Sequence, residues 1–178
     1  MKLDTDKRSV VKRLELHHAE ELFQLIDKSR ESLSAWLTFP TYTHSVSDTV
    51  AFIEKSLKRS ETNNGYWSGI WYEGKLVGSI GLLYIDYTTR RTEMGYWLGE
   101  EFVGKGLMTN ACTQLIRVAF DELNLQKTEI KVATINTKSQ AIPMKLGFTQ
   151  EGIIRRDERI NNTFHDRILY GLLKDEWE

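Results

Sequence analysis

Cysteine is nearly absent from this 178-residue chain, which contains only Cys112. A single thiol excludes a disulfide within the chain and suits a reducing compartment. Cys112 lies among apolar residues in a segment with helical periodicity, where a small thiol usually packs as a hydrophobic side chain. We therefore predict a buried structural role for Cys112 rather than a nucleophilic one.

The chain also lacks an excess of either charge and any long apolar run. It has 24 Lys and Arg residues against 25 Asp and Glu residues, a formal net charge of −1, which argues against nucleic-acid binding through bulk charge. No apolar run approaches the ~18 residues of a membrane-spanning helix, and residues 1–8 lack the apolar core of a signal peptide. We expect a cytoplasmic protein with no direct nucleic-acid or membrane partner.

Metal-ligand spacing is missing as well. The four histidines are scattered, at His17, His18, His44 and His165, so solvent-facing roles are expected and no metal site is predicted. The hydrophobic fraction of 40% and the charged fraction of 28% are those of an ordinary globular protein. The length suits one well-buried domain, which we expect to cover residues 1–178.

Apolar periodicity predicts alternating strands and helices. The expected strands are 9–14, 66–72, 76–85, 92–98, 128–133, 148–156 and 164–172, and the expected helices are 17–30, about 47–59, 107–123 and 138–146. Ser47 and Asp48 are candidate N-caps of the second helix. Turns at 73–75 and at Asn161-Asn162 predict hairpins. This order predicts one mixed α/β sheet with helices on its faces.

The stretch 94–109 reads as a strand, a glycine turn and the first turn of a helix. Gly104 and Gly106 lack a Cβ, so the backbone can adopt unusual dihedral angles and approach a ligand closely. The free N–H groups and positive dipole end of the following helix favour an anion. Together these features are typical of a phosphate-binding loop.

Three kinds of phosphate ligand compete for this loop. An ATP or GTP loop needs Ser or Thr where Gly106 stands, to bind magnesium through its hydroxyl. A dinucleotide loop needs Gly or Ala where Thr109 stands. The third interpretation is the acyl-CoA pyrophosphate loop of the GNAT N-acyltransferases, which Gly104 and Gly106 fit, although Glu101 replaces the usual Gln or Arg. A helix start without a ligand is the structural alternative.

Further motifs strengthen the third interpretation. They are Asn136-x-x-Ser139 with Lys145-Leu146-Gly147-Phe148, Ser29-Arg30-x-x-Leu33-x-x-Trp36-Leu37, Glu93-Met94-Gly95-Tyr96-Trp97, Glu151-Gly152, and Asp166 with Tyr170-x-Leu172-Leu173 and Glu176-Trp177. Their joint spacing over most of the chain resembles the GNAT superfamily, and its RimJ/RimL-type N-acetyltransferases in particular. The resemblance implies a single-domain mixed sheet, mostly antiparallel, of about seven strands with helices on both faces.

The resemblance also implies acetyl-CoA as co-substrate, bound without a metal. Its pantetheine arm would contact the main chain of Trp97, Leu98 and Gly99, and Asn136 would be a side-chain partner. Its pyrophosphate would meet N–H groups along the loop and the first helical turn, that is Val103, Gly104, Lys105, Gly106, Leu107, Met108 and Thr109.

The catalytic residues follow from the same resemblance. Glu93 lies where several family members place a catalytic Glu, and a carboxylate can take the amine proton directly or through water. The alternative for Glu93 is an edge-of-sheet carboxylate paired with Arg90 or Arg91. Many relatives carry a tyrosine acid at the position of Pro143, which cannot donate a proton, so Ser139 is the remaining candidate acid. Ser139 is also a candidate helix N-cap.

The acceptor side is expected at Trp36, Phe39 and Tyr42, which could wall a slot for a peptide, although core or dimer packing is equally open. We expect an N-acetyltransferase for a primary amine, with a protein N-terminal α-amino group as the leading acceptor. The alternatives are a small amine, such as a polyamine or an amine antibiotic, and a non-catalytic acyl-CoA-binding module. The sequence leaves the acyl-chain length and a homo-oligomeric state open.

Overall fold

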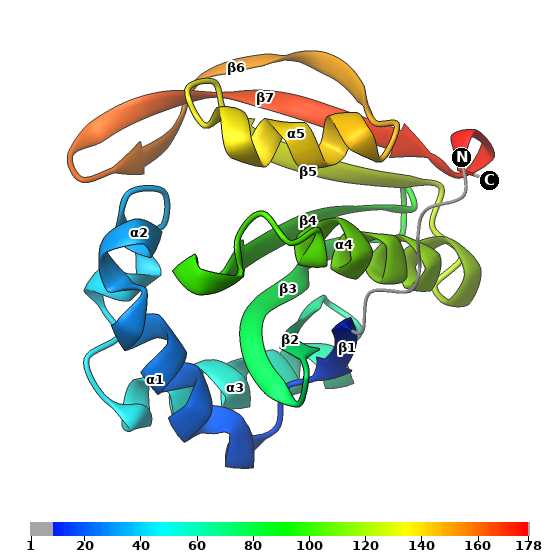
Figure 1. The fold of residues 1–178 in the computed structure, drawn as a ribbon. Coiled ribbons are helices and arrows are strands. Elements are labelled where there is room, and N and C mark those ends of the chain that lie inside the picture. Colours follow the sequence, from blue (N-terminus) through cyan, green and yellow to red (C-terminus); the bar gives the residue numbers. More distant parts are fainter. Residues whose placement is uncertain (1–8, 178) are drawn as a thin grey trace.

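The computed structural model describes residues 9–177 (Figure 1). The segment 1–8, where no signal core is expected, and residue 178 lie outside the described residues, so the single domain over 1–178 stays a prediction. The strands are β1 (Ser9–Arg13), β2 (Tyr66–Tyr72), β3 (Lys75–Asp86), β4 (Arg91–Leu98), β5 (Lys127–Ala133), β6 (Thr149–Ile160) and β7 (Thr163–Leu173). The α-helices are α1 (Ala19–Lys28), α2 (Arg30–Ser34), α3 (Val46–Glu61), α4 (Leu107–Arg117) and α5 (Thr137–Lys145).

All seven strands join one sheet in the order β1-β2-β3-β4-β5-β7-β6. Every neighbouring pair is antiparallel except β4 and β5, which are parallel. The two predicted hairpins are present, and their turn residues Glu73-Gly74 and Asn161-Asn162 have φ angles of 49°, 77°, 50° and 64°. Positive φ at both central residues is the geometry that matches the twist of the flanking strands. The predicted mixed, mostly antiparallel sheet is therefore confirmed.

Helices cover both faces of the sheet, as expected (Figure 1). Successive strand side chains point to opposite faces, so Ile70 and Trp71 belong to two different cores. Ile70 packs in the core that contains Leu115 of α4, while Trp71 packs with Leu22 of α1 and Ile53 of α3. Cys112 is fully buried in the first of these cores, which confirms its predicted structural position.

Strands β4 and β5 diverge after a short parallel pairing. They pair only over Arg91–Glu93 with Lys127–Glu129. Beyond that point β4 continues beside β3, and β5 continues beside β7. The two strands therefore spread apart in the middle of the sheet, at the end where the glycine loop leaves β4.

Three local predictions were wrong. The N-cap of α3 is Ser45, and Asp48 is the third helical residue of a capping box: its Oδ2 accepts from Ser45 N at 3.0 Å. The segment after α1 forms the short helix α2, which no apolar period signalled. The N-cap of α5 is Asn136, whose Oδ1 accepts from Ser139 N at 3.3 Å, so Ser139 lies inside the first turn rather than at the cap.

The sequence predicts no membrane-spanning helix. Within the part of the chain that the structure describes, no helix is both long enough and apolar enough to span a bilayer.

Candidate active site

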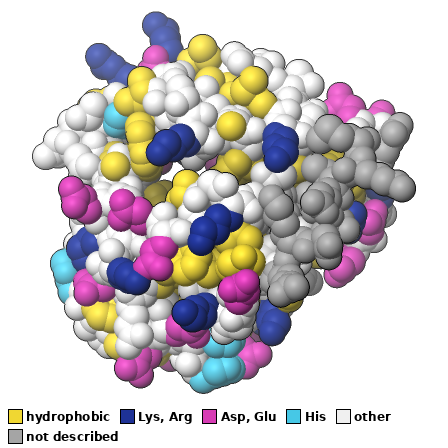
Figure 2. Space-filling view, viewed as in Figure 1, with side chains coloured by type: hydrophobic (Ala, Val, Ile, Leu, Met, Phe, Trp, Pro, Cys, Tyr) yellow, Lys and Arg dark blue, Asp and Glu magenta, His cyan; other side chains and the backbone are white. Residues whose placement is uncertain are grey.

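The glycine loop presents an open helix N-terminus. Gly104 and Gly106 have φ angles of 82° and 73°, the left-handed region that favours glycine. Gly106 is the N-cap of α4, no side chain caps this end, and the first turn carries no acidic residue. The first N–H groups of α4 therefore remain available, which is the arrangement that binds phosphate. A space-filling view from the same side shows basic, acidic and apolar side chains interspersed over the visible surface (Figure 2).

Two charged residues of the loop, Glu101 and Lys105, each contact another side chain. Glu101 forms an ion pair with Lys28 of α1, and this hydrogen bond lowers the pKa of the Glu101 carboxyl. Its negative charge is thereby partly balanced beside the phosphate site. Lys105 Nζ lies over the ring of Phe102, 5.5 Å from its centroid. The ammonium group of Lys105 therefore places a positive charge beside the loop backbone.

The register of β4 against β3 determines which backbone groups of β4 face the gap toward β5. Gly99 N donates to Val77 O of β3 at 2.8 Å, and Trp97 lies opposite Ser79 of the same strand. Since alternate residues of an antiparallel pair direct their N–H and C=O groups toward the partner, Trp97 and Gly99 face β3. The N–H and C=O groups of Leu98 point toward the gap instead, as do those of Tyr96. The expected main-chain contact therefore fits Leu98, whereas Trp97 and Gly99 are already committed to β3.

The start of α5 is held from both sides. Asn136 caps the helix through Ser139 N. Pro143 lies inside the helix, so it removes the N–H that would bond to Ser139 O. The Tyr96 hydroxyl donates to Ser139 O at 3.3 Å and replaces that bond. Burial raises the pKa of Tyr96 well above its usual range, so the hydroxyl stays a donor.

Two carboxylates of the sheet, Glu93 and Glu158, form what we call the carboxylate pair. Strands β5 and β7 lie between their strands, β4 and β6. Glu93 of β4 is 7% exposed, and its Oε2 lies 3.4 Å from Lys131 Nζ. The alternative of an edge-of-sheet carboxylate paired with Arg90 or Arg91 is wrong, because β4 has β3 on one side and β5 on the other, and the ion pair is with Lys131.

Glu158 of β6 is the second carboxylate. Its Oε1 is 4.0 Å from Arg167 Nη1, while Arg167 Nη2 bonds more closely to Asp157 Oδ2 at 2.7 Å. Burial raises the pKa of the Glu158 carboxyl. Arg167 and His165 oppose the rise, and Asp157 and then Glu93 add smaller contributions to it. Nothing in the strand 148–156 or the charges after it singles Glu158 out, because its burial and its pairing opposite His165 arise only from the fold.

The predicted acceptor residues lie on one segment, residues 36–43, which we call the aromatic loop. The Trp36 ring is 6.3 Å from the ring of His165 on β7, and Phe39 is 5.6 Å from Trp97. Tyr42 is 74% exposed. Asn161 Nδ2 donates to Ser34 O at 2.9 Å, which ties the β6–β7 turn to the start of this loop.

Within residues 9–177, no group of three His, Cys, Asp or Glu side chains is arranged so that it could hold a metal ion. The amide groups of α4 can neutralise phosphates without one.

Comparisons with known proteins agree with this geometry. The family model for the acetyltransferase (GNAT) domain matches residues 8–149. The chain is 39% identical to "Putative ribosomal N-acetyltransferase YdaF" of Bacillus subtilis (strain 168), over 94% of this chain and 92% of that protein. It is 28% identical to the ribosomal-protein-serine acetyltransferase of Escherichia coli (strain K12), over 96% of this chain and 98% of that protein.

A solved structure has the same fold. The Microcin C7 self immunity acetyltransferase MccE, in complex with acetyl-CoA and AMP, superimposes with a TM-score of 0.91 at 30% identity, covering 96% of this chain and 95% of that one. The chain belongs to the GNAT acetyltransferase family. It is an acetyl-CoA-dependent N-acetyltransferase.

Proposed function

We propose that this enzyme acetylates the N-terminal α-amino group of a protein, of the ribosomal-protein kind, in the cytoplasm. The names of the two relatives support a ribosomal protein as acceptor. The observation that carries the α-amino assignment is the carboxylate pair, in which Lys131 holds Glu93 while Glu158 has a raised pKa.

This arrangement provides one available base rather than two. An α-amino group has an ordinary pKa of about 7.7–8.0 and is already partly deprotonated near neutral pH, whereas a lysine side chain near ~10.4 is almost wholly protonated. One carboxylate that can take up the amine proton is sufficient for the first amine and poorly suited to the second.

Of the two candidates for the base, the contacts favour Glu158. Glu93 already has the Lys131 ammonium group at 3.4 Å, whereas the guanidinium nearest Glu158 bonds more closely to Asp157. We propose that Glu158 accepts the amine proton, directly or through water, and that burial keeps the pKa of Glu158 high. Glu93 remains the second candidate for the base.

Apart from Trp97 and Gly99, which face β3, the other predicted site residues keep the roles that the sequence indicated. The amides of Val103 to Thr109 would hold the pyrophosphate, with Lys105 adding charge nearby. The Leu98 main chain and Asn136 would hold the pantetheine arm. The Ser139 hydroxyl would protonate the leaving thiolate, and solvent could share that step. Trp36 and Phe39 would shape the acceptor site, with Tyr42 at its exposed rim.

The aromatic loop also argues against a polycation. Residues 36–43 contain no Asp or Glu, so this wall offers no acidic cradle for spermidine. The test is a thiol-release assay with acetyl-CoA and three acceptors: a short peptide with a free N-terminus, the same peptide capped at the N-terminus but carrying lysine, and spermidine. We expect the highest kcat/KM for the free N-terminus. A higher kcat/KM for either other acceptor would refute the proposal.

A further inference from the structure

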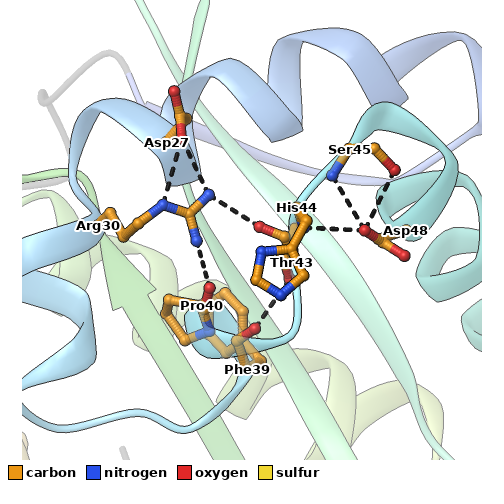
Figure 3. Close-up of polar contacts among 8 residues, drawn as sticks. All are labelled: Asp27, Arg30, Phe39, Pro40, Thr43, His44, Ser45 and Asp48. Carbon is orange, nitrogen blue, oxygen red and sulfur yellow. Dashed lines mark hydrogen bonds and ion pairs between the residues drawn. The ribbon is translucent and has the colours of Figure 1, made fainter.

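Arg30 connects the first helical segment to the aromatic loop (Figure 3). Its Nε and Nη2 donate to Asp27 Oδ1 at 3.2 and 2.9 Å. On the other side, Nη2 donates to Thr43 O at 2.8 Å and Nη1 donates to Pro40 O. One guanidinium therefore fixes two carbonyl groups of the loop to the end of α1.

The fork shape of the guanidinium matters for this role. Pro40 O and Thr43 O belong to backbone groups three residues apart, and a planar guanidinium can donate to both while Asp27 holds it in place. An ammonium group is a compact point charge and has no such fixed fork. The side chain of Arg30 is about one-third exposed, at 32%, so these bonds are partly shielded from water.

The rest of the loop is braced around the same point. Thr43 Oγ1 donates to Phe39 O at 2.9 Å, and Asp48 Oδ2 accepts from His44 N at 2.8 Å just beyond the loop (Figure 3). The loop is therefore anchored at its far end by α3 and in its middle by Arg30. Without Arg30, the carbonyls of Pro40 and Thr43 would lose their link to α1.

The position of the aromatic side chains depends on this link. Phe39 packs on Trp97, and Trp36 lies beside His165, which is opposite Glu158 in the β6–β7 pairing. The loop is thus the element that places Trp36 beside His165, the residue paired with Glu158 across β6 and β7.

The neighbouring residue serves the cofactor side instead. Ser29 Oγ accepts from Glu100 N at 3.1 Å, at the start of the glycine loop. The two adjacent residues of the Ser29-Arg30 motif therefore have separate partners.

We propose that Arg30 is a positioning residue for the acceptor: it holds the aromatic loop in the shape that receives the substrate amine and its peptide. This proposal rests on the proposed function. Arg30 does not touch the reacting atoms. Its loss should weaken acceptor binding while leaving acetyl-CoA binding and the chemical step nearly unchanged.

The experiment compares Arg30→Met and Arg30→Lys with Arg117→Met, a control in which an exposed arginine of α4 is removed. KM and kcat are measured for the free-N-terminal peptide, and KM for acetyl-CoA. We expect Arg30→Met to raise the peptide KM roughly 10-fold or more, because a charged donor to two carbonyls is lost. Arg30→Lys should give a smaller rise, and Arg117→Met should give none.

A second readout does not depend on turnover. Backbone amide exchange in residues 36–45 should be faster in Arg30→Met than in the wild type or in Arg117→Met. If wild type acetylates no N-terminal peptide, the proposed function fails, and faster exchange still supports the positioning of the loop by Arg30. Unchanged exchange together with an unchanged peptide KM would overturn the proposal. An equal rise in KM for acetyl-CoA would also overturn it, since Arg30 would then act on the cofactor side. Faster exchange with an unchanged peptide KM would refute the link between this loop and the acceptor.

Discussion

The hydroxyl of Tyr96 lies 3.3 Å from the carbonyl oxygen of Ser139 and takes the bond that Pro143 cannot make. Within a helix, Ser139 O would accept from the N–H four residues later, and proline has none. A residue of β4 therefore fixes the first turn of α5 across the gap where β4 and β5 spread apart. Ser139, the candidate acid, depends on this contact for its position.

This relationship predicts an energetic coupling between Tyr96 and Pro143. Tyr96→Phe should cost about 1 kcal/mol of unfolding free energy, the net value of one such hydrogen bond. In a Pro143→Ala background the new N–H can bond to Ser139 O, so the same change should cost measurably less. Denaturant unfolding of the four variants gives the coupling energy. An equal cost of Tyr96→Phe in both backgrounds would show that the two groups do not share this carbonyl.

The glycine loop offers a matched pair of substitutions. Gly104 and Gly147 have φ angles of 82° and 83°, and a Cβ at either would have no neighbour within 4 Å. Each change to Ala should therefore cost a similar stability, about 1 kcal/mol, because of the left-handed backbone alone. Only Gly104→Ala should weaken acetyl-CoA binding in calorimetry, roughly 10-fold if one amide–phosphate bond is lost. Equal acetyl-CoA affinity in both variants would place the pyrophosphate elsewhere.

The carboxylate pair predicts distinct pH profiles. Glu158→Gln should lower kcat/KM for the peptide by roughly 10²–10⁴ and remove the acidic limb, since a base must be deprotonated to act. Glu93→Gln removes a negative charge that raises the pKa of Glu158. Its acidic limb should therefore move to lower pH, with a smaller loss at neutral pH. If Glu93→Gln instead abolished turnover while Glu158→Gln lost less than about threefold, Glu93 would be the base.

The raised pKa of Glu158 should also affect the free energy of unfolding, which can be measured without any substrate. The folded pKa of Glu158 lies above its unfolded value of about 4.3, since burial disfavours its charged form. The contribution of Glu158 to stability is therefore fully present below pH ~4.3 and is lost as pH rises through the folded pKa. The stability of Glu158→Gln relative to wild type should increase from pH 4 to pH 7 in urea unfolding. A difference that stays flat or decreases over this range would contradict the raised pKa.

The sequence predicted the sheet and the strand, glycine turn and helix of the loop well because all of these depend on local patterns. The apolar periods of β2, β3 and β4 and the glycines 104 and 106 are read from neighbouring residues, and the structure confirms the strands and the left-handed glycines. The two hairpin turns were likewise visible as short polar segments.

The rest of the site depends on contacts between distant segments. Glu158 is one charge among many in β6, and its burial and its pairing opposite His165 of β7 exist only in the folded sheet. The role of Arg30 requires the fold of residues 40–43 around it, for which no periodic signal exists. The commitment of Gly99 to Val77 could not be read without knowing the register of β3 and β4.

The central claim is that the acceptor is an α-amino group, and one peptide that carries both amines tests it most directly. A short peptide with a free N-terminus and one internal lysine is incubated with the enzyme and limiting acetyl-CoA, and tandem mass spectrometry locates the acetyl group. Both amines then compete within the same molecule at the same concentration. The account predicts that the first product carries its acetyl group on the N-terminal nitrogen. A first product acetylated on the lysine side chain would contradict it.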